Sequence, residues 1–277
     1  MIEFLLQKQN PDGGWPYRVG GPWTEPTVYA TLALIAAGEK AAADRGVAWM
    51  LRTAQEDGGW ASRPEAEESS WVTALAALLP EDKLGRAPRQ RAIRWLLSVR
   101  GEDTMPLENI RMRLLGGKSS PDSNHPGWPW TVGAAAWVNP TTVALLALER
   151  EQRLNPSDMV AARAEAGRKY LLAHMFADGG WNYGATSAWG FDMRPYPETT
   201  GMALAALRGV RAPQMEKAFA AARRFLDTRS ADAQNWLQLG LRAHGQLPDG
   251  YQPPADVRYR TVTETALHLV ASGGGFA

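Results

Sequence analysis

Two kinds of helical segment alternate along the 277-residue chain. One kind carries charges on one face, as Arg89, Arg91 and Arg94 do in the segment that ends near Leu97. The other kind is almost wholly Ala, Leu and Val, as in residues 28–34. Because helices that are apolar all round are buried, the second kind should be covered by the first. The pattern predicts repeated units of one outer and one inner helix.

An aromatic turn joins the two helices in the clearest units. Asp-Gly-Gly-Trp occurs at residues 12–15, 57–60 and 178–181, each time between a charged and an apolar segment. Its glycines should adopt the positive φ values that end a helix sharply. Two further units, 93–97 with 139–148 and 225–226 with 236–239, lack such a turn.

Stacking these units buries every apolar face, as repeat architectures require, and so few units should close into a ring. A last inner helix at 263–270 follows a Pro-rich loop, 246–260, that contains no outer partner. We therefore predict an all-α (α/α)6 toroid of inner and outer helices, with the sixth outer helix reduced or absent. It should form one domain over residues 1–277, with a long loop insert at 101–138.

The first turn resembles a known family repeat. Residues 9–15, Gln-Asn-Pro-Asp-Gly-Gly-Trp, are similar to the Gln-x-x-x-Gly-x-Trp repeat of squalene and oxidosqualene cyclases and of prenyltransferase β subunits. The second copy is one residue shorter, and the fourth has Met175 in place of the glutamine. The resemblance implies a terpenoid-cyclase-like toroid. It also implies that Gln9 ties an outer helix to the start of an inner one, with Trp15 stacked on it.

The catalytic motifs of that family are missing. Class II cyclases protonate their substrate from Asp-x-Asp-Asp, and the most similar segment, 189–203, keeps only the carboxylate of Glu198. The helix dipole should favour the charged form of Glu198, so we interpret it as a helix-start residue beside a capping Thr199 or Thr200. With no cysteine, the Asp-Cys-His zinc site of protein prenyltransferases cannot form, and no Asp-Asp-x-x-Asp magnesium motif occurs. We expect no metal and no cofactor.

Charge and hydropathy exclude other classes. Thirty Lys and Arg against 29 Asp and Glu leave a net charge of +1, which argues against nucleic-acid binding. No apolar run approaches the roughly 20 residues that cross a bilayer. Without a secretory leader, the chain is expected to be cytoplasmic, with peripheral membrane contact left open.

The ring geometry should bring the turns before the inner helices to a shared mouth. We take Asp192 and Glu198 as catalytic candidates, and Glu25 should lie at the same mouth. The insert at 101–138 is long enough to act as a lid or binding element. The expected ligand-binding residues are Trp23, Trp71, Trp128, Trp137, Phe191, Tyr196 and Glu264. Alternatively, these aromatic side chains simply fill a ring that has no cavity.

Three functions are compatible with these features. The first is binding of an isoprenoid or other apolar small molecule in the ring, with or without degenerate cyclase activity of the isomerase or transferase type. The second is an enzyme that uses other acids, drawn from Asp192, Glu198, Asp256 and Glu264, whose signature would be a raised pKa in a cavity. The third is a non-enzymatic scaffold with a protein partner. The resemblance to cyclases favours the first.

Overall fold

The computed structural model describes residues 1–102, 125–184, 187–188 and 191–276. Within these ranges it contains twelve helices and two small antiparallel ribbons, β1–β2 and β3–β4. The inner helices are α2 (Thr24–Ala36), α4 (Val72–Ala76), α8 (Val138–Leu154), α10 (Pro197–Ala206), α12 (Ala231–Ala243) and α13 (Val262–Ser272). The outer helices are α1 (Ile2–Lys8), α3 (Lys40–Arg52), α6 (Arg86–Ser98), α9 (Asp158–Ala173) and α11 (Met215–Arg224), with the short α5 (Glu81–Leu84) before α6.

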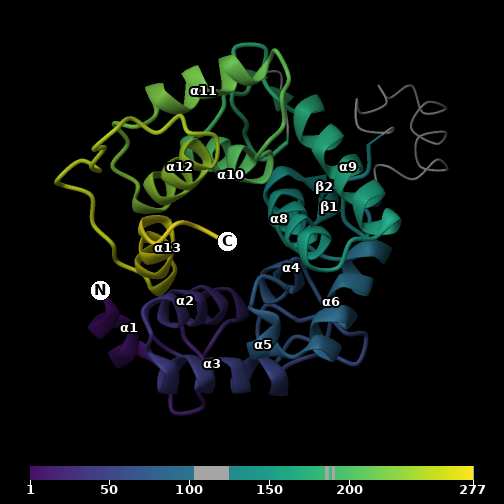
Figure 1. The fold of residues 1–277 in the computed structure, drawn as a ribbon, viewed down its shortest axis with the longest axis vertical. Helices are drawn as coiled ribbons and strands as arrows, with labels where there is room; N and C mark the ends of the chain where they lie inside the picture. Colours follow the sequence, from purple (N-terminus) through teal and green to yellow (C-terminus); the bar gives the residue numbers. More distant parts are fainter. Residues whose placement is uncertain (103–124, 185–186, 189–190, 277) are drawn as a thin grey trace.

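The six inner helices form a closed ring, because each packs against its neighbours and α13 packs against α2 (Figure 1). Between α12 and α13, where a sixth outer helix would stand, residues 245–261 form no helix. The predicted toroid with an absent sixth outer helix is therefore confirmed. Most buried side chains of the inner helices are Ala, Leu, Val and Thr, and the larger ones include Tyr29, Met202 and Trp236.

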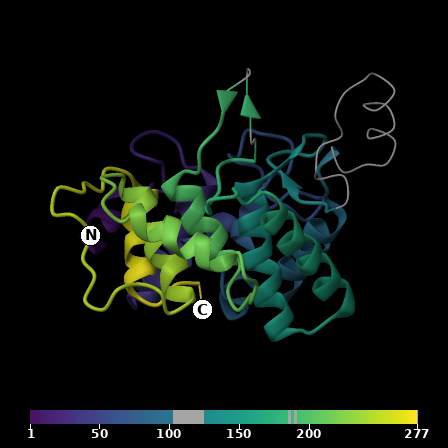
Figure 2. The same ribbon diagram turned by 90° about the horizontal axis from the view of Figure 1, so that it is seen from above.

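The ring has two unlike faces, which Figure 2 shows at its upper and lower edges. We call the face that holds the N-termini of the inner helices the turn face. The ribbon of β3 (Ser187–Ala188) and β4 (Phe191–Asp192), which leads into α10, projects from it. The C-termini of the inner helices lie at the opposite face, here called the far face, near the C-terminal end of the chain. Turns and tail thus occupy opposite openings of the ring.

Four buried tryptophans tie the outer helices α1, α3, α6 and α9 to their inner partners. Each donates its ring N–H to a carbonyl near the end of the outer helix, and its backbone N–H to a threonine hydroxyl at the start of the inner helix. The ring bonds are Trp15 to Leu5 (2.7 Å), Trp60 to Met50 (2.7 Å), Trp128 to Leu96 (2.9 Å) and Trp181 to Leu171 (2.6 Å). The backbone bonds go to Thr27, Thr73, Thr141 and Thr200. These bonds satisfy polar groups that burial would otherwise leave unpaired.

The expectation that the third unit lacks an aromatic turn is wrong. Trp128 follows its outer helix after the long insert, in the ribbon of β1 (Trp128–Pro129) and β2 (Ala136–Trp137). It nevertheless makes the same two hydrogen bonds as the other three tryptophans. The Arg163 guanidinium lies 3.2 Å from the centre of the Trp128 ring, which adds a cation–π contact.

Gln9 bridges neighbouring outer helices instead of joining an outer helix to its inner partner. Its amide donates to the carbonyls of Gly13 and of Ala42 in α3, both at 2.9 Å. Asp12 adds a second link, because Trp49 of α3 donates to its carboxylate at 3.2 Å. The connection within the unit is made by Trp15, so the role inferred for the glutamine from the family resemblance is wrong.

In each complete turn, the residue after the aspartate must be glycine, because its backbone is left-handed and because a side chain there would collide with the next outer helix. Gly13, Gly58 and Gly179 have φ values of 96°, 90° and 93°, which confirms the expected left-handed backbone. A Cβ atom at Gly13 would lie 2.5 Å from the Arg45 carbonyl oxygen, and one at Gly179 would lie 2.2 Å from that of Lys217. The turns therefore pack against the next outer helix as closely as backbone allows.

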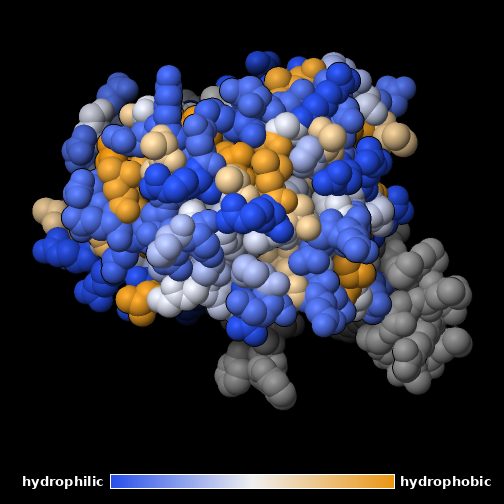
Figure 3. Space-filling model, turned by 90° about the horizontal axis from the view of Figure 1, so that it is seen from below, coloured by the Kyte–Doolittle hydropathy of each residue, from blue (hydrophilic) through white to orange (hydrophobic). Residues whose placement is uncertain are grey.

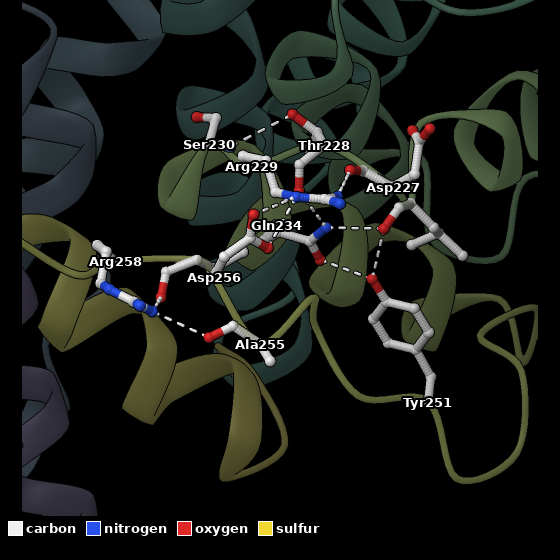
Figure 4. A network of polar contacts seen from close by, with 11 residues as sticks. Asp227, Thr228, Arg229, Ser230, Gln234, Tyr251, Ala255, Asp256 and Arg258 are labelled. Carbon is white, nitrogen blue, oxygen red and sulfur yellow. Dashed lines mark hydrogen bonds and ion pairs between the residues drawn. The ribbon is translucent and has the colours of Figure 1, made fainter.

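In the fifth unit, a tyrosine and a glutamine replace the tryptophan (Figure 4). The hydroxyl of Tyr251, from the loop that replaces the sixth outer helix, donates to the Leu226 carbonyl at 2.8 Å. Gln234 of α12 donates to the same oxygen, also at 2.8 Å. The end of this outer helix is thus capped by different residues in the same manner.

The wall of outer helices shown in Figure 3 is mainly hydrophilic, with small separate apolar groups. Among the described residues, no helix is both long and apolar enough to span a bilayer.

Candidate functional site at the turn face

Three carboxyl groups occupy the same position on three inner helices. Glu25, Glu198 and Asp232 are the second residues of α2, α10 and α12. Glu25 and Glu198 precede by two residues the threonines that hold the tryptophan turns, Thr27 and Thr200. Because the helices are related by the ring, equal positions place these carboxyl groups at one opening. Counting back two residues from the turn threonines Thr73 and Thr141 gives Trp71 and Asn139, and the second residue of α13 is Thr263.

Burial raises the pKa of all three groups. The pKa of Glu25 rises from its ordinary value of 4.5 to about 7, even though a hydrogen bond from the Tyr17 hydroxyl opposes the rise. Desolvation likewise raises the pKa of Glu198. The pKa of Asp232 lies well above its ordinary value, first through burial and then through the charges of Glu198, Glu25 and Glu264.

The helix dipole was expected to favour the charged form of Glu198, but desolvation outweighs it and raises the pKa of this group. The expected caps are also absent. Thr199 donates to the Trp181 carbonyl at 2.6 Å, and Thr200 accepts from the Trp181 backbone, so both hydroxyls hold the turn. Glu198 is left without a hydrogen-bond partner among the described residues, and its carboxyl group is available at the turn face.

Buried amide oxygens without a donor lie on the same helices. Asn139 is 5% exposed, and its amide donates to the Met202 sulfur at 3.5 Å, one turn along α10 from Glu198. Asn235, one turn along α12 from Asp232, is fully buried and donates to the Glu264 carbonyl at 2.8 Å. The side-chain oxygens of both asparagines have no hydrogen-bond partner among the described residues. Buried acceptors of this kind call for a donor from water or a ligand.

Aromatic side chains from α2, α12 and the C-terminal tail meet deeper in the ring. Tyr29 of α2 and Trp236 of α12 lie edge to face with ring centres 6.5 Å apart. Phe276, from the C-terminal tail, lies 6.3 Å from Tyr29 and 5.8 Å from Trp236.

Four predicted ligand-binding aromatics do lie at the start of inner helices. Trp23, Trp137 and Tyr196 directly precede α2, α8 and α10, and Trp71 directly precedes α4. Trp23 packs against Tyr17 at 5.6 Å, Trp71 against Trp130 at 4.9 Å, and Tyr196 against Tyr183 at 5.5 Å. Trp137 is 38% exposed. The turn face is therefore rich in partly exposed aromatic rings.

Other predicted site residues have structural roles or are not described. Trp128 is 2% exposed and holds the third unit, so its assignment to ligand binding is corrected. Glu264 forms the capping box of α13 with Thr261. Asp256 pairs with Arg229 at 2.7 Å in the loop drawn in Figure 4. Phe191 and Asp192 form strand β4, but their side chains lie outside the described residues, as do residues 103–124 of the insert.

Sequence reasoning singled out Glu198 and placed Glu25 at the mouth, but it missed Asp232, Asn139 and Asn235. Counting back two residues from each threonine that accepts from a turn tryptophan would have found Asn139, which precedes Thr141 by two residues. Among the described residues, no group of His, Asp and Glu side chains could hold a metal ion.

The raised pKa of Glu25 has a measurable effect on stability. The folded protein keeps this proton up to about pH 7, whereas the unfolded chain loses it near 4.5, so stability falls as the pH rises between these values. From pH 5 to pH 8, this group should lower the free energy of unfolding by about 2–3 kcal/mol. Glu25→Gln removes the titration, so the variant should match the wild type near pH 5 and exceed it at pH 8.

Urea unfolding of both proteins at pH 5, 6, 7 and 8 measures this difference, and histidine titrations common to both cancel. Glu216→Gln, an exposed site on α11, is the control and should follow the wild type. Parallel pH profiles for Glu25→Gln and the wild type would contradict a raised pKa at Glu25.

The comparisons with known proteins show the fold alone. No protein-family model matches the sequence, and neither does any curated protein. A GH8 endo-β-1,4-glucanase from an Achatina fulica gut metagenomic library is similar in structure, with a TM-score of 0.63 and 12% identity over 98% of this chain and 96% of that one. A type II terpene cyclase from Scytonema has a TM-score of 0.56 and 18% identity, over 97% and 75%. A protein from Actinoplanes has a TM-score of 0.56 and 21% identity, over 96% and 77%.

The chain thus shares its α/α toroid with a terpene cyclase and with glycoside hydrolases.

Proposed function

We propose that the protein binds an isoprenoid or other apolar ligand at the turn face and transfers a proton to it from the cluster of Glu25, Glu198 and Asp232. It would then be a degenerate cyclase of the isomerase or transferase type. The observation that carries this proposal is the placement of three carboxyl groups, each with a raised pKa, at one position of three inner helices. Perturbed carboxyl groups gathered in this way are typical of catalytic sites.

The three groups are suited to different parts of a proton transfer. The charges of its neighbours help to raise the pKa of Asp232, so Asp232 and Glu198 are the proton donors. With a pKa of about 7, Glu25 is partly ionised at neutral pH, and the hydrogen bond from Tyr17 stabilises its charged form, so Glu25 is the partner that accepts a proton. General acids and bases work best with pKa values near the working pH. Asp192, in the ribbon beside α10, stays a further candidate.

The raised pKa values limit the substrate groups that this cluster could protonate. A carboxylic acid whose pKa is raised by burial keeps its proton closer to neutral pH than an ordinary carboxylic acid does, but it is too weak to protonate an isolated alkene. An oxygen atom of an epoxide, ether or allylic alcohol is a better acceptor. The proton goes to this oxygen, the C–O bond breaks with its electron pair on oxygen, and an ionised carboxylate removes a proton from the carbocation. Aromatic faces such as Trp71 and Tyr196 would stabilise the intermediate cation.

Hydrolysis of a glycosidic bond is a second candidate. Glycosidases use one carboxyl group with a raised pKa as the acid and a second carboxylate as the base or nucleophile. The grouping of Glu25, Glu198 and Asp232 provides both, and the fold is shared with glycoside hydrolases.

The test is incubation with oxidosqualene, squalene and farnesyl and geranylgeranyl diphosphates, and separately with cello- and xylo-oligosaccharides. Native mass spectrometry detects retained ligand, and extraction followed by mass spectrometry detects products. Glu198→Gln and Asp232→Asn should abolish the product of an oxygen-bearing isoprenoid, while Glu216→Gln keeps it. Product from oligosaccharides alone would replace the first proposal with the second. If the protein neither binds nor converts any of these compounds, both proposals are overturned and the protein-interaction scaffold is favoured.

A further inference from the structure

A separate hollow of about 290 Å³ opens at the far face, away from the carboxyl groups. The C-terminal ends of α8, α10 and α12 form its walls, and residues 274–276 of the tail form its roof. Its volume is at the lower end of the range for ligand pockets, roughly 300–1,000 Å³, so it suits a small molecule. Because the hollow lies at the face opposite the turn face, ligand binding there can be tested separately from activity at the turn face.

Three arginines from three helices converge on this hollow. They are Arg153 of α8, Arg208 just beyond α10, and Arg242 of α12. Arg242 donates to the Ala271 carbonyl of α13. Among the described residues, Arg153 and Arg208 have no hydrogen-bond or ion-pair partner. Each could therefore turn its guanidinium to an anion without breaking an existing bond.

Among the described residues that line the hollow, no carboxylate is paired with Arg153 or Arg208. Glu149 also lines the hollow, but its carboxylate pairs with Arg168 of α9. The positive field reaches neighbouring groups, because Arg208 helps to lower the pKa of His244, although burial is the larger cause. Arginines near helix C-termini also complement the helix dipole, but that effect does not require three of them to face one hollow.

The inner wall of the hollow is apolar. Leu146, Ala205, Leu239 and Phe276 line it. Phe276 in turn packs against Tyr29 and Trp236. A ligand that fits must combine a short apolar part with an anionic group at the arginine rim. Guanidinium groups bind phosphate oxygens with paired hydrogen bonds, and three of them suit a dianion.

We infer that the far-face hollow between α8, α10, α12 and residues 274–276 binds a small organic phosphate, with its apolar part toward Phe276 and its phosphate at Arg153, Arg208 and Arg242. This inference does not depend on the proposed function at the turn face.

Isothermal titration calorimetry with n-hexyl phosphate as the probe tests it. Inorganic phosphate, hexanoate and hexanol separate the contribution of the phosphate group from that of the apolar chain. Each of the three should bind at least tenfold more weakly than hexyl phosphate. The variant Arg153→Gln/Arg208→Gln should weaken hexyl phosphate binding at least tenfold. Arg224→Gln, an exposed arginine on α11, is the matched control and should bind as the wild type does. Circular dichroism and thermal melting verify that the variants are folded.

Absence of binding to the wild type, or equal binding by the double variant, would overturn the inference. Equal affinity for hexanoate would overturn the assignment to phosphate. Glu198→Gln should keep wild-type affinity for hexyl phosphate, so loss of activity at the turn face and loss of binding at the far face are distinguishable.

Discussion

Trp128→Ala should lower the free energy of unfolding by about 4 kcal/mol, among the largest effects of any single truncation in this chain. The ring is 2% exposed and donates to the Leu96 carbonyl, which would be left buried without a donor. The change also removes the aromatic face beneath the Arg163 guanidinium. Urea unfolding followed by far-ultraviolet circular dichroism measures the loss.

The matched control is Trp137→Ala, its partner in the β1–β2 ribbon. Trp137 is 38% exposed, so its truncation should cost less than about 1 kcal/mol. Trp128→Phe should give an intermediate loss, because it keeps most of the packing but not the N–H donor. If Trp128→Ala costs no more than Trp137→Ala, then Trp128 does not hold the third unit together.

The ring could be predicted because its signal repeats along the chain. Apolar inner segments and Asp-Gly-Gly-Trp turns recur, and each copy supports the interpretation of the others. The third turn does not show in the motif, because His-Pro-Gly precedes Trp128 in place of Asp-Gly-Gly. Trp60 and Trp128 each precede their threonine by 13 residues, a spacing that the long insert before Trp128 does not alter.

The candidate site was only partly predictable. Glu198 was found by its position relative to a family motif, whereas its environment was misjudged, since sequence shows the helix N-terminus but not the desolvation. Asp232 was missed because its helix lacks a tryptophan turn, so no motif marked its register. The charge repulsion that helps to raise its pKa comes from residues 25 and 198, which only the closed ring brings near.

Arg89 shows a further limit of the sequence pattern. It was counted with the charged face of an outer helix, yet its side chain is fully buried between α4, α6 and α8. It donates to the Glu151 carboxylate at 2.9 Å and to the carbonyls of Ala77 and Leu79 at 2.7 and 3.2 Å. Helical periodicity alone cannot distinguish a solvated arginine from one that caps the end of a neighbouring helix.

Arg89→Met should therefore lower the free energy of unfolding by about 3–5 kcal/mol, because it leaves the buried Glu151 charge uncompensated. Arg94→Ala, at an exposed position of the same helix, is the control and should cost less than about 1 kcal/mol. Adding Glu151→Leu to Arg89→Met removes the stranded charge, and the double variant should regain much of the loss. Urea unfolding of the four proteins of this cycle measures the coupling. If the double variant is as unstable as the sum of the two single variants, the main role of Arg89 is to cap the α4 carbonyls and not to neutralise Glu151.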